Sequence, residues 1–358
     1  MSKALRVGVV GGGIGRWHIE GWKKLEGQAE VLAICEIDAA KGKEVADLYA
    51  VPSVVSSLDD LLRRDDIDVI DLCTPPFLHF EQIQAVLKAG KHVVCEKPLV
   101  ASLADVDALA VAEKTSGKRL MPIFQYRFGH GLQKLKYLIE LGLAGEAFLA
   151  TAETAWRRRA SYYDVPWRGK WKTELGGAVL GHAIHNHDII SYVLGPAKSI
   201  YARAVTRVNK IEVEDCATAS MEMQNGALVS LSVTLGSPDE ISRHRFCFRN
   251  LVAESCLLPY SNSSDPWKFT GDSPEIQKEI DDALAKFVPQ HENFAGQFSR
   301  FCTALAAGTE LPVTLADART SLELVTAIYT SSEEGALVAL PLTSTHSRYK
   351  SWLPQTKS

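Results

Sequence analysis

Between residue 5 and about residue 124, short apolar runs rich in Val and Ile alternate with segments whose apolar residues recur every three or four positions. The runs expected to form strands span residues 5–10, 31–35, 69–73, 92–95 and 120–124. The segments with helical spacing include residues 58–62, 79–89 and 103–112. Strands and helices in alternation predict an α/β Rossmann fold, a doubly wound parallel sheet with helices on both faces.

After residue 125 the pattern changes to that of an α+β domain. We expect a helix over 132–141, a strand over 147–156, a loop rich in Arg and aromatic residues, and a helix over 177–194. Further strands follow, and alternating residues on either side of Asn225-Gly226 predict a hairpin in a large, open-faced, mostly antiparallel sheet. The expected closing elements are helices over 294–307 and 315–331 and a loose tail after Pro341.

The length of 358 residues favours two hydrophobic cores over one. We expect a dinucleotide-binding domain over 1–124 and a substrate-binding and oligomerisation domain over 125–358. One face of the predicted hairpin is apolar, which predicts association as a homo-dimer or homo-tetramer unless helices cover it. The residues of that face are Val229, Leu231, Val233 and Leu235.

Composition narrows the kind of partner. The chain carries 39 Lys and Arg against 43 Asp and Glu, a net charge of −4, so no basic field would draw it to nucleic acid or to an anionic membrane. No apolar stretch approaches the roughly 20 residues that span a bilayer. The seven cysteines form no CxxC pair and fit free thiols in a reducing cytoplasm. We therefore expect a cytoplasmic protein with a small-molecule partner.

A glycine-rich turn follows the first predicted strand and opens a helix. Backbone N–H groups at such a turn can approach a pyrophosphate. The turn consists of Gly11, Gly12, Gly13, Ile14 and Gly15, with Arg16 where a literal GxGxxG would place its third glycine. At the end of the second strand, Glu36 is suited to accept hydrogen bonds from a ribose and to repel a 2′-phosphate, although Asp38 could take that role. The pattern favours NAD over NADP as the cofactor.

The turn Glu96-Lys97-Pro98 follows the strand predicted over 92–95. Lys97 would then lie at the carboxyl edge of a parallel sheet, where open α/β sheets bind ligands. An ammonium beside a cofactor can stabilise alkoxide character on a reacting oxygen, whereas most lysines are solvated surface charges. Pro98 is a candidate for a cis peptide bond.

A second cluster lies between Gly181 and Asp188. On a continuous helix, His182, His185 and Asp188 would share one face and His187 would point elsewhere. Metal binding is a weak alternative because the spacing lacks accompanying Cys or Glu ligands, so no metal is expected. Partly buried helix polar groups are another alternative. General acid–base chemistry by His185 is the favoured interpretation, since imidazole titrates near neutral pH.

Together these motifs resemble the Gfo/Idh/MocA (glucose-fructose oxidoreductase / inositol dehydrogenase) family over nearly the whole chain. The residues that carry the resemblance are Gly11 to Gly15 with His18, Thr74-Pro75 with His79, Glu96-Lys97-Pro98, and Gly176-Gly177 through His185 and Asp188. The resemblance implies that Lys97 and His185 are catalytic and converge on one substrate oxygen. It also implies that Thr74, Pro75, His79, Glu96 and Lys97 line the dinucleotide site, and that Trp167-Arg168 approaches the nicotinamide. Gly181 departs from the aspartate of many polyol-oxidising members, and His182 could compensate.

The resemblance implies an NAD-dependent dehydrogenase for a CH–OH group of a sugar, cyclic polyol or sugar derivative. Aromatic side chains of the loop could stack on a sugar ring while arginines donate to hydroxyls or an acid group. The expected substrate contacts are Lys97, Arg127, Trp156, Tyr163, His182, His185 and Asp188. Two alternatives remain open: a glycosidase that acts by transient oxidation with bound NAD, and a non-enzymatic dinucleotide-binding sensor.

Overall fold

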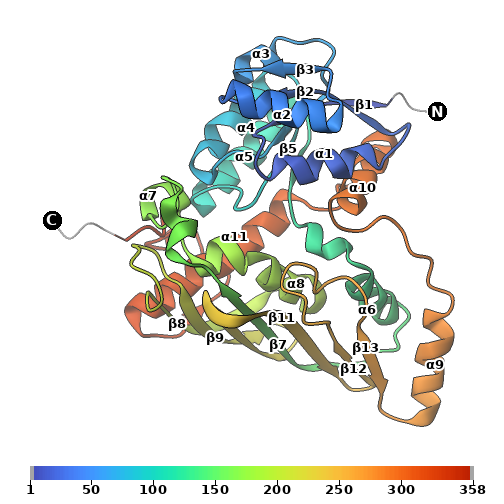
Figure 1. The fold of residues 1–358 in the computed structure, drawn as a ribbon. Coiled ribbons are helices and arrows are strands. Elements are labelled where there is room, and N and C mark those ends of the chain that lie inside the picture. Colours follow the sequence, from blue (N-terminus) through green and yellow to red (C-terminus); the bar gives the residue numbers. More distant parts are fainter. Residues whose placement is uncertain (1–3, 355–358) are drawn as a thin grey trace. The chain divides into compact units, whose positions relative to one another are not determined.

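The computed structural model describes residues 4–354, which form two compact units (Figure 1). Unit 1 comprises the chain up to Gln125 together with His291–Arg319, and unit 2 comprises Tyr126–Gln290 together with the chain from Thr320 onward. Among the described residues, no helix is both long and apolar enough to cross a membrane.

Unit 1 is built on a six-stranded parallel sheet in the order β3-β2-β1-β4-β5-β6. Its strands are β1 (Leu5–Val10), β2 (Ala29–Cys35), β3 (Ser53–Val55), β4 (Val69–Leu72), β5 (His92–Cys95) and β6 (Leu120–Pro122). The predicted doubly wound fold is confirmed. The strand order reverses between β1 and β4, and such a reversal creates a crevice at the carboxyl ends of the strands.

Helices of the first 125 residues connect these strands. They are α1 (Gly15–Lys23), α2 (Ala39–Tyr49), α3 (Leu58–Leu62), α4 (His79–Lys88) and α5 (Leu103–Ser116). Several start at side-chain caps: the Asp38 carboxylate accepts from the N–H groups of Ala40 and Lys41 at the start of α2. Asp38 is therefore a helix cap, an ordinary use of Asp before a helix.

Unit 1 also includes α10 (Asn293–Ala307), although the sequence pattern assigns that helix to the second domain. The reason is aromatic packing against α1. Trp22 stacks on Phe298 with ring centroids 4.0 Å apart, and Gly21 leaves the space that Phe294 and Phe298 fill. The predicted domain of residues 125–358 is therefore interrupted by residues 291–319.

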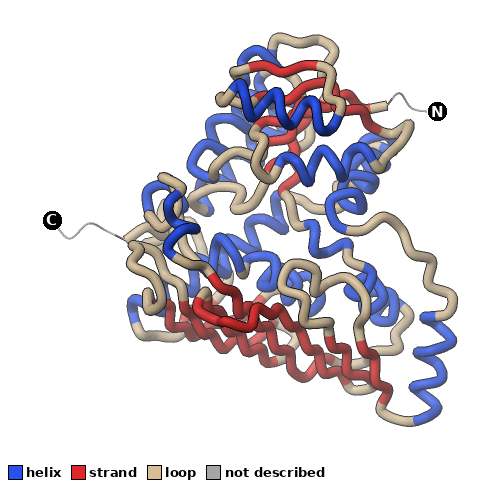
Figure 2. Tube along the Cα trace, in the orientation of Figure 1, coloured by secondary structure: helices blue, strands red, loops and turns tan. Residues whose placement is uncertain are grey.

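Unit 2 contains an eight-stranded, mostly antiparallel sheet in the order β13-β12-β11-β7-β10-β9-β8-β14 (Figure 2). The strands are β7 (Ala147–Arg157), β8 (Ala197–Val205), β9 (Cys216–Met223), β10 (Leu228–Thr234), β11 (Gly236–Phe248), β12 (Leu251–Glu254), β13 (Lys268–Gly271) and β14 (Val338–Ala339). The predicted hairpin is confirmed as β9–β10, with Gly226 at φ 88° in the turn. Among the described strands of this sheet, the β7–β10 pair alone is parallel.

The apolar face of the hairpin is covered within unit 2 itself. Val229, Leu231 and Val233 are buried, and α8 (Ile184–Leu194) packs against the same sheet. The argument that this face requires a partner subunit is therefore wrong. The opposite face of the sheet is open, and its exposed side chains include Leu149, Tyr201, Val205 and Leu228.

The other helices of unit 2 are α6 (His130–Glu140), α7 (Trp171–Glu174), α9 (Pro274–Leu284) and most of α11 (Leu315–Glu334). The helix predicted over 177–194 is not continuous, because residues Ala178–His182 form a π-helical turn before α8 begins. The predicted tail after Pro341 has no helix or strand as far as residue 354, but it is anchored, and its last four residues lie outside the described part of the chain. Trp352 is fully buried and its indole N–H donates to the carbonyl oxygen of Leu175 at 2.7 Å.

Candidate active-site residues

The glycine turn of unit 1 has the backbone geometry of a dinucleotide-binding loop. Gly11 has φ 98°, and a Cβ there would lie 2.7 Å from the carbonyl oxygen of Cys73. Space is open beside Gly13, and α1 begins without a side-chain cap, so N–H groups at its start can receive a phosphate. Gly15 packs closely on Val9, which is the helix–strand contact that a third glycine serves in such motifs.

The acidic residue at the end of β2 contacts this turn directly. Glu36 Oε2 accepts from the N–H of Gly12 at 2.8 Å and from Lys41 Nζ at 2.7 Å. Although burial opposes ionisation, these two bonds keep the pKa of Glu36 below its ordinary value. Glu36 Oε1 makes a longer contact of 3.4 Å with the N–H of Asp38, so this oxygen has capacity to accept from a ribose. Of the two acidic candidates, Glu36 rather than Asp38 therefore fits the ribose.

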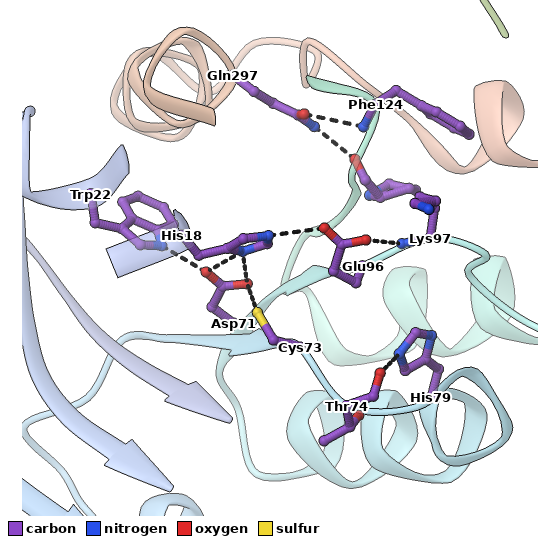
Figure 3. A network of polar contacts seen from close by, with 11 residues as sticks. His18, Trp22, Asp71, Cys73, Thr74, His79, Glu96, Lys97, Phe124 and Gln297 are labelled. Carbon is purple, nitrogen blue, oxygen red and sulfur yellow. Dashed lines mark hydrogen bonds and ion pairs between the residues drawn. The ribbon is translucent and has the colours of Figure 1, made fainter. Parts of the chain in front are cut away.

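The turn after β5 holds the candidate catalytic lysine. The Lys97–Pro98 peptide bond is cis, as predicted. The backbone N–H of Lys97 donates to Glu96 Oε2 at 2.9 Å, so the buried carboxylate of Glu96 is attached to the turn that carries Lys97 (Figure 3). Lys97 follows β5 at the carboxyl edge of the sheet, the position expected of it.

His79 links two loops at the same edge. Its Nδ1 lies 2.9 Å from the carbonyl oxygen of Pro98. Its Nε2 lies 2.9 Å from the carbonyl oxygen of Thr74 (Figure 3). Burial lowers the pKa of His79, and a neutral ring donates only one of these bonds at a time. Thr74 donates its hydroxyl to Gln82, and Pro75 precedes a short 3-10 turn over Pro76–Leu78. His79 is thus placed to hold the loops rather than to present its ring to a ligand.

In unit 2, His182 lies on the π-helical turn and His185 on the first turn of α8. The ring of His185 stacks on Tyr126 with centroids 4.5 Å apart, and His182 Nε2 lies 3.1 Å from the hydroxyl of Tyr162. His187 is fully buried, and burial lowers its pKa to about 3. His187 does point away from the face expected for His185, and it lies in the core.

The predicted substrate contacts Arg127 and Asp188 bind each other. Two guanidinium nitrogens lie 2.7 and 2.6 Å from the two carboxylate oxygens, and Ser321 adds a hydroxyl at 3.1 Å. Both side chains are at least 95% buried, with exposures of 5% and 2%. A buried bidentate pair of this kind fixes α8 to the segment before α6, so its first role is to hold the helix that carries His185.

Aromatic and arginine side chains gather around His182. Trp156 contacts His182 edge-on at 5.8 Å and donates its indole N–H to Ser242. The guanidinium of Arg158 lies over the rings of Trp156, Tyr162 and Tyr260. These contacts form an aromatic wall around a guanidinium that also pairs with Glu240 at 3.2 Å.

The remaining predicted residues of this region lie beside that wall. The guanidinium of Arg168 is held over the rings of Tyr162 and Trp167 and pairs with Glu174 at 3.6 Å. Tyr163 is half-buried, and burial raises the pKa of its phenol. A Cβ added at Gly181 would have as its nearest neighbour a carboxylate oxygen of Glu174, at 3.9 Å. Glu174 thus brings a carboxylate near Gly181.

Sequence reasoning missed several buried acids and their partners, and three of these acids contact segments described above. Asp71 lies in β4 and contacts His18 and Trp22, while Glu214 accepts from the N–H groups of Gly177 and Val179 at the start of the π-helical turn. Burial raises the pKa of Glu214 to about 7. The third, Glu174, is described above. For Asp71 the sequence held a usable signal. It is the one charged residue in the apolar run of residues 69–73, and a buried charge requires partners.

Comparisons with known proteins agree with this geometry. Residues 5–124 match the model of an oxidoreductase family with an NAD-binding Rossmann fold, and residues 132–248 match the GFO/IDH/MocA C-terminal domain. The 4-carboxy-2-hydroxymuconate-6-semialdehyde dehydrogenase of Sphingobium sp. is 30% identical over 238 residues, which cover 65% of this chain and 73% of that protein. The myo-inositol 2-dehydrogenase of Thermotoga maritima is 29% identical over 230 residues, covering 63% and 66%.

Among solved structures, the WlbA dehydrogenase from Bordetella pertussis, in complex with NADH and UDP-GlcNAcA, is similar over almost all of both chains. It is 30% identical with a TM-score of 0.82 and covers 95% of this chain and 100% of that one. By sequence, the chain spans 66% of the length of several curated relatives. Both halves of the chain therefore have relatives in the same group of oxidoreductases.

Proposed function

Because the chain belongs to the Gfo/Idh/MocA family of NAD-binding oxidoreductases, we propose that it transfers a hydride between nicotinamide and a secondary alcohol or ketone of a sugar, cyclic polyol or sugar derivative. The observation that carries the proposal is the turn at Lys97. This turn follows β5 at the carboxyl edge of the parallel sheet, and Glu96 binds its backbone.

In the oxidation direction, Lys97 donates to the substrate oxygen and stabilises the alkoxide that develops there. His185 takes the hydroxyl proton as general base, with its ring oriented by stacking on Tyr126. A bound nicotinamide supplies the carbon that accepts the hydride. The residues suited to hold the cofactor are the glycine turn of residues 11–15 and Glu36, while Trp167 and Arg168 remain predicted contacts.

We propose NAD as the cofactor in preference to NADP. Glu36 supports this preference, because its carboxylate is ionised at the end of β2 and would repel a 2′-phosphate.

The substrate we favour carries an acid group on a sugar ring. Support comes from the two guanidinium groups of Arg158 and Arg168, which lie among the aromatic rings beside His182. Stacking on Trp156 and Tyr162 suits the apolar CH face of a sugar, while a guanidinium suits a carboxylate. The proposed test set therefore includes uronic acids and their nucleotide conjugates beside neutral aldoses, inositols and anhydrosugars.

The test is NADH formation across that panel with the wild type and two variants. Lys97→Met keeps much of the side-chain volume without the ammonium, so turnover should fall about 10²-fold or more while NADH binding is retained. His185→Asn should lower turnover by roughly 10² to 10⁴. Full turnover by Lys97→Met would exclude this mechanism, and glycoside cleavage without net NADH would favour the glycosidase alternative.

We also propose that the protein forms a homo-oligomer through the open face of the eight-stranded sheet, not through the hairpin face, which is buried within unit 2. Exposed apolar side chains on that face, including Tyr201 and Leu228, support this proposal. Light scattering should show a dimer or tetramer at micromolar concentration, and Leu228→Arg should shift it toward monomer. A wild-type monomer would contradict the proposal.

A further inference from the structure

A buried network of polar side chains lies directly behind the turn that carries Lys97. His18 comes from α1, Asp71 from β4, and Glu96 follows β5, so three separate elements meet there (Figure 3). His18 Nδ1 lies 2.9 Å from both carboxylate oxygens of Asp71, and His18 Nε2 lies 3.0 Å from Glu96 Oε1. His18 and Asp71 are completely buried.

The arrangement of acceptors determines the charge of His18. Both of its ring nitrogens face carboxylate oxygens, and only an imidazolium donates from both nitrogens at once. Burial opposes the charge, but Asp71 outweighs it and raises the pKa of His18 well above the ordinary value. Two carboxylates brought close together without a cation would also repel each other.

The groups that pack around the ring reinforce this state. Trp22 donates its indole N–H to Asp71 at 2.7 Å, and Cys73 is the other titratable group in contact with Asp71. The rings of Phe294 and Phe298 from α10 cover His18 at centroid distances of 4.3 and 5.4 Å. The network is therefore closed on one side by hydrocarbon, which strengthens its electrostatic interactions.

Glu96 continues the network to the catalytic turn. Its Oε1 accepts from His18 and its Oε2 accepts from the backbone N–H of Lys97. We propose that His18 is a positioning residue: as an imidazolium held between Asp71 and Glu96, it fixes the Glu96 carboxylate against the Lys97 backbone and so holds the catalytic lysine in its working orientation. This inference rests on the proposed role of Lys97.

The same atoms raise the question of a metal site. Ligand atoms of His18, Asp71 and Cys73 all lie within 4.8 Å of one another. The distances from His18 to both of its carboxylate partners are those of charge-assisted hydrogen bonds, and a metal would have to replace a proton that Asp71 already receives. The two interpretations make opposite predictions for the protons on the ring.

The first experiment needs no substrate. In NMR spectra of the full protein with ring-labelled ¹⁵N histidine, the His18 signals are identified by their loss in His18→Gln. Both ring nitrogens of His18 should stay protonated at pH values well above the ordinary titration near pH 6.5. A neutral ring at pH near 8 would overturn the proposal. Stoichiometric Zn²⁺ binding that removes the N–H signals would also overturn it.

The second experiment tests whether His18 acts through Glu96. His18→Gln should lower kcat about 10-fold or more, leave KM for NAD within about twofold, and move the acid limb of the pH profile upward, because Glu96 loses its cation. His18→Gln should add little in a Glu96→Gln background, since coupled residues are not additive. Additive losses would show that His18 acts elsewhere.

His92→Gln is the matched control, because it replaces another histidine of unit 1, which lies in β5 and whose Nδ1 accepts from the backbone N–H of Arg119 at 3.1 Å. It should leave kcat and the pH profile unchanged. If the wild type oxidises no CH–OH compound, the proposed function fails, while the NMR result still decides whether the imidazolium between two carboxylates exists.

Discussion

Glu36 holds the glycine turn and Lys41 at the same time, so the carboxylate that we propose to select the cofactor also fixes the loop. Glu36→Ser should raise the ratio of kcat/KM for NADP over NAD by about tenfold or more, equivalent to about 1.4 kcal/mol. There are two physical reasons. The substitution removes the charge that repels a 2′-phosphate, and it releases the ammonium of Lys41, which can then bind the phosphate. Steady-state kinetics with both cofactors measures this ratio.

The control separates the two causes. The double variant Glu36→Ser, Lys41→Met should prefer NADP less than Glu36→Ser alone. It still lacks the carboxylate that repels the 2′-phosphate, but it also lacks the ammonium that would bind this phosphate. A wild type that already prefers NADP would contradict the assignment of Glu36.

Individual site residues differ in how far the sequence could predict them. Lys97 and Glu36 follow directly from strand ends, because the carboxyl ends of parallel strands define the site. Asp71 and Glu214 could not be assigned, since their partners His18, Gly177 and Tyr329 come from distant segments. The mutual pairing of Arg127 and Asp188 was likewise hidden, as 61 positions separate the two residues.

At the level of elements, the π-helical turn before α8 depends on one glycine. A Cβ at Gly177 would lie 1.8 Å from the carbonyl oxygen of Glu214, which is backbone and cannot turn aside. Gly177→Ala should therefore destabilise the protein by about 3 kcal/mol or more and reduce His185-dependent turnover. Chemical denaturation together with the activity assay measures both effects.

Gly181 in the same turn provides the control. A Cβ there meets nothing closer than a Glu174 oxygen at 3.9 Å, so Gly181→Ala should fold with nearly unchanged stability. Equal damage from the two substitutions would show that the turn is sensitive to any side chain, not to this backbone contact.

The elements themselves were largely predictable, because strands and helices with strong periodicity leave a clear pattern. The strands β1, β4 and β5, helix α3 and the β9–β10 hairpin were all predicted close to their observed bounds. The π-helical turn was not predicted. Ala178–His182 consists of ordinary helical residues, and Glu214, which accepts a hydrogen bond from this turn, comes from a distant part of the sequence. Helix α2 and strand β3 were missed, because both present little apolar periodicity.

For the whole molecule, buried neutral histidines predict sensitivity to acid. His244 lies in the core of unit 2, where its Nε2–H donates to the carbonyl oxygen of Asn186 and its Nδ1 accepts from Asn262. Burial lowers the pKa of His244 to about 4 and that of His187 to about 3. Between about pH 6.5 and pH 4 the unfolded chain binds protons that the folded chain does not, so the free energy of unfolding falls as the pH falls.

Denaturant titrations across that pH range should show this decline in the free energy of unfolding. His244 should account for about 3 kcal/mol of the decline at most. His244→Gln should make the slope shallower even if it lowers stability overall. His18 does not contribute in this range, because its raised pKa gives stability that is complete below about pH 6.5 and is lost only at higher pH. An unchanged slope in His244→Gln would contradict the assignment.

The interleaving of the two units has a consequence for synthesis on the ribosome. The segment of residues 291–319 completes unit 1, and the burial of Trp352 completes unit 2. In the nascent Rossmann domain, Trp22 and the face of α1 that packs on α10 must therefore stay exposed until most of the chain has left the ribosome. Unlike a protein whose amino-terminal domain folds as soon as it is translated, this one has to finish both of its cores late and nearly together.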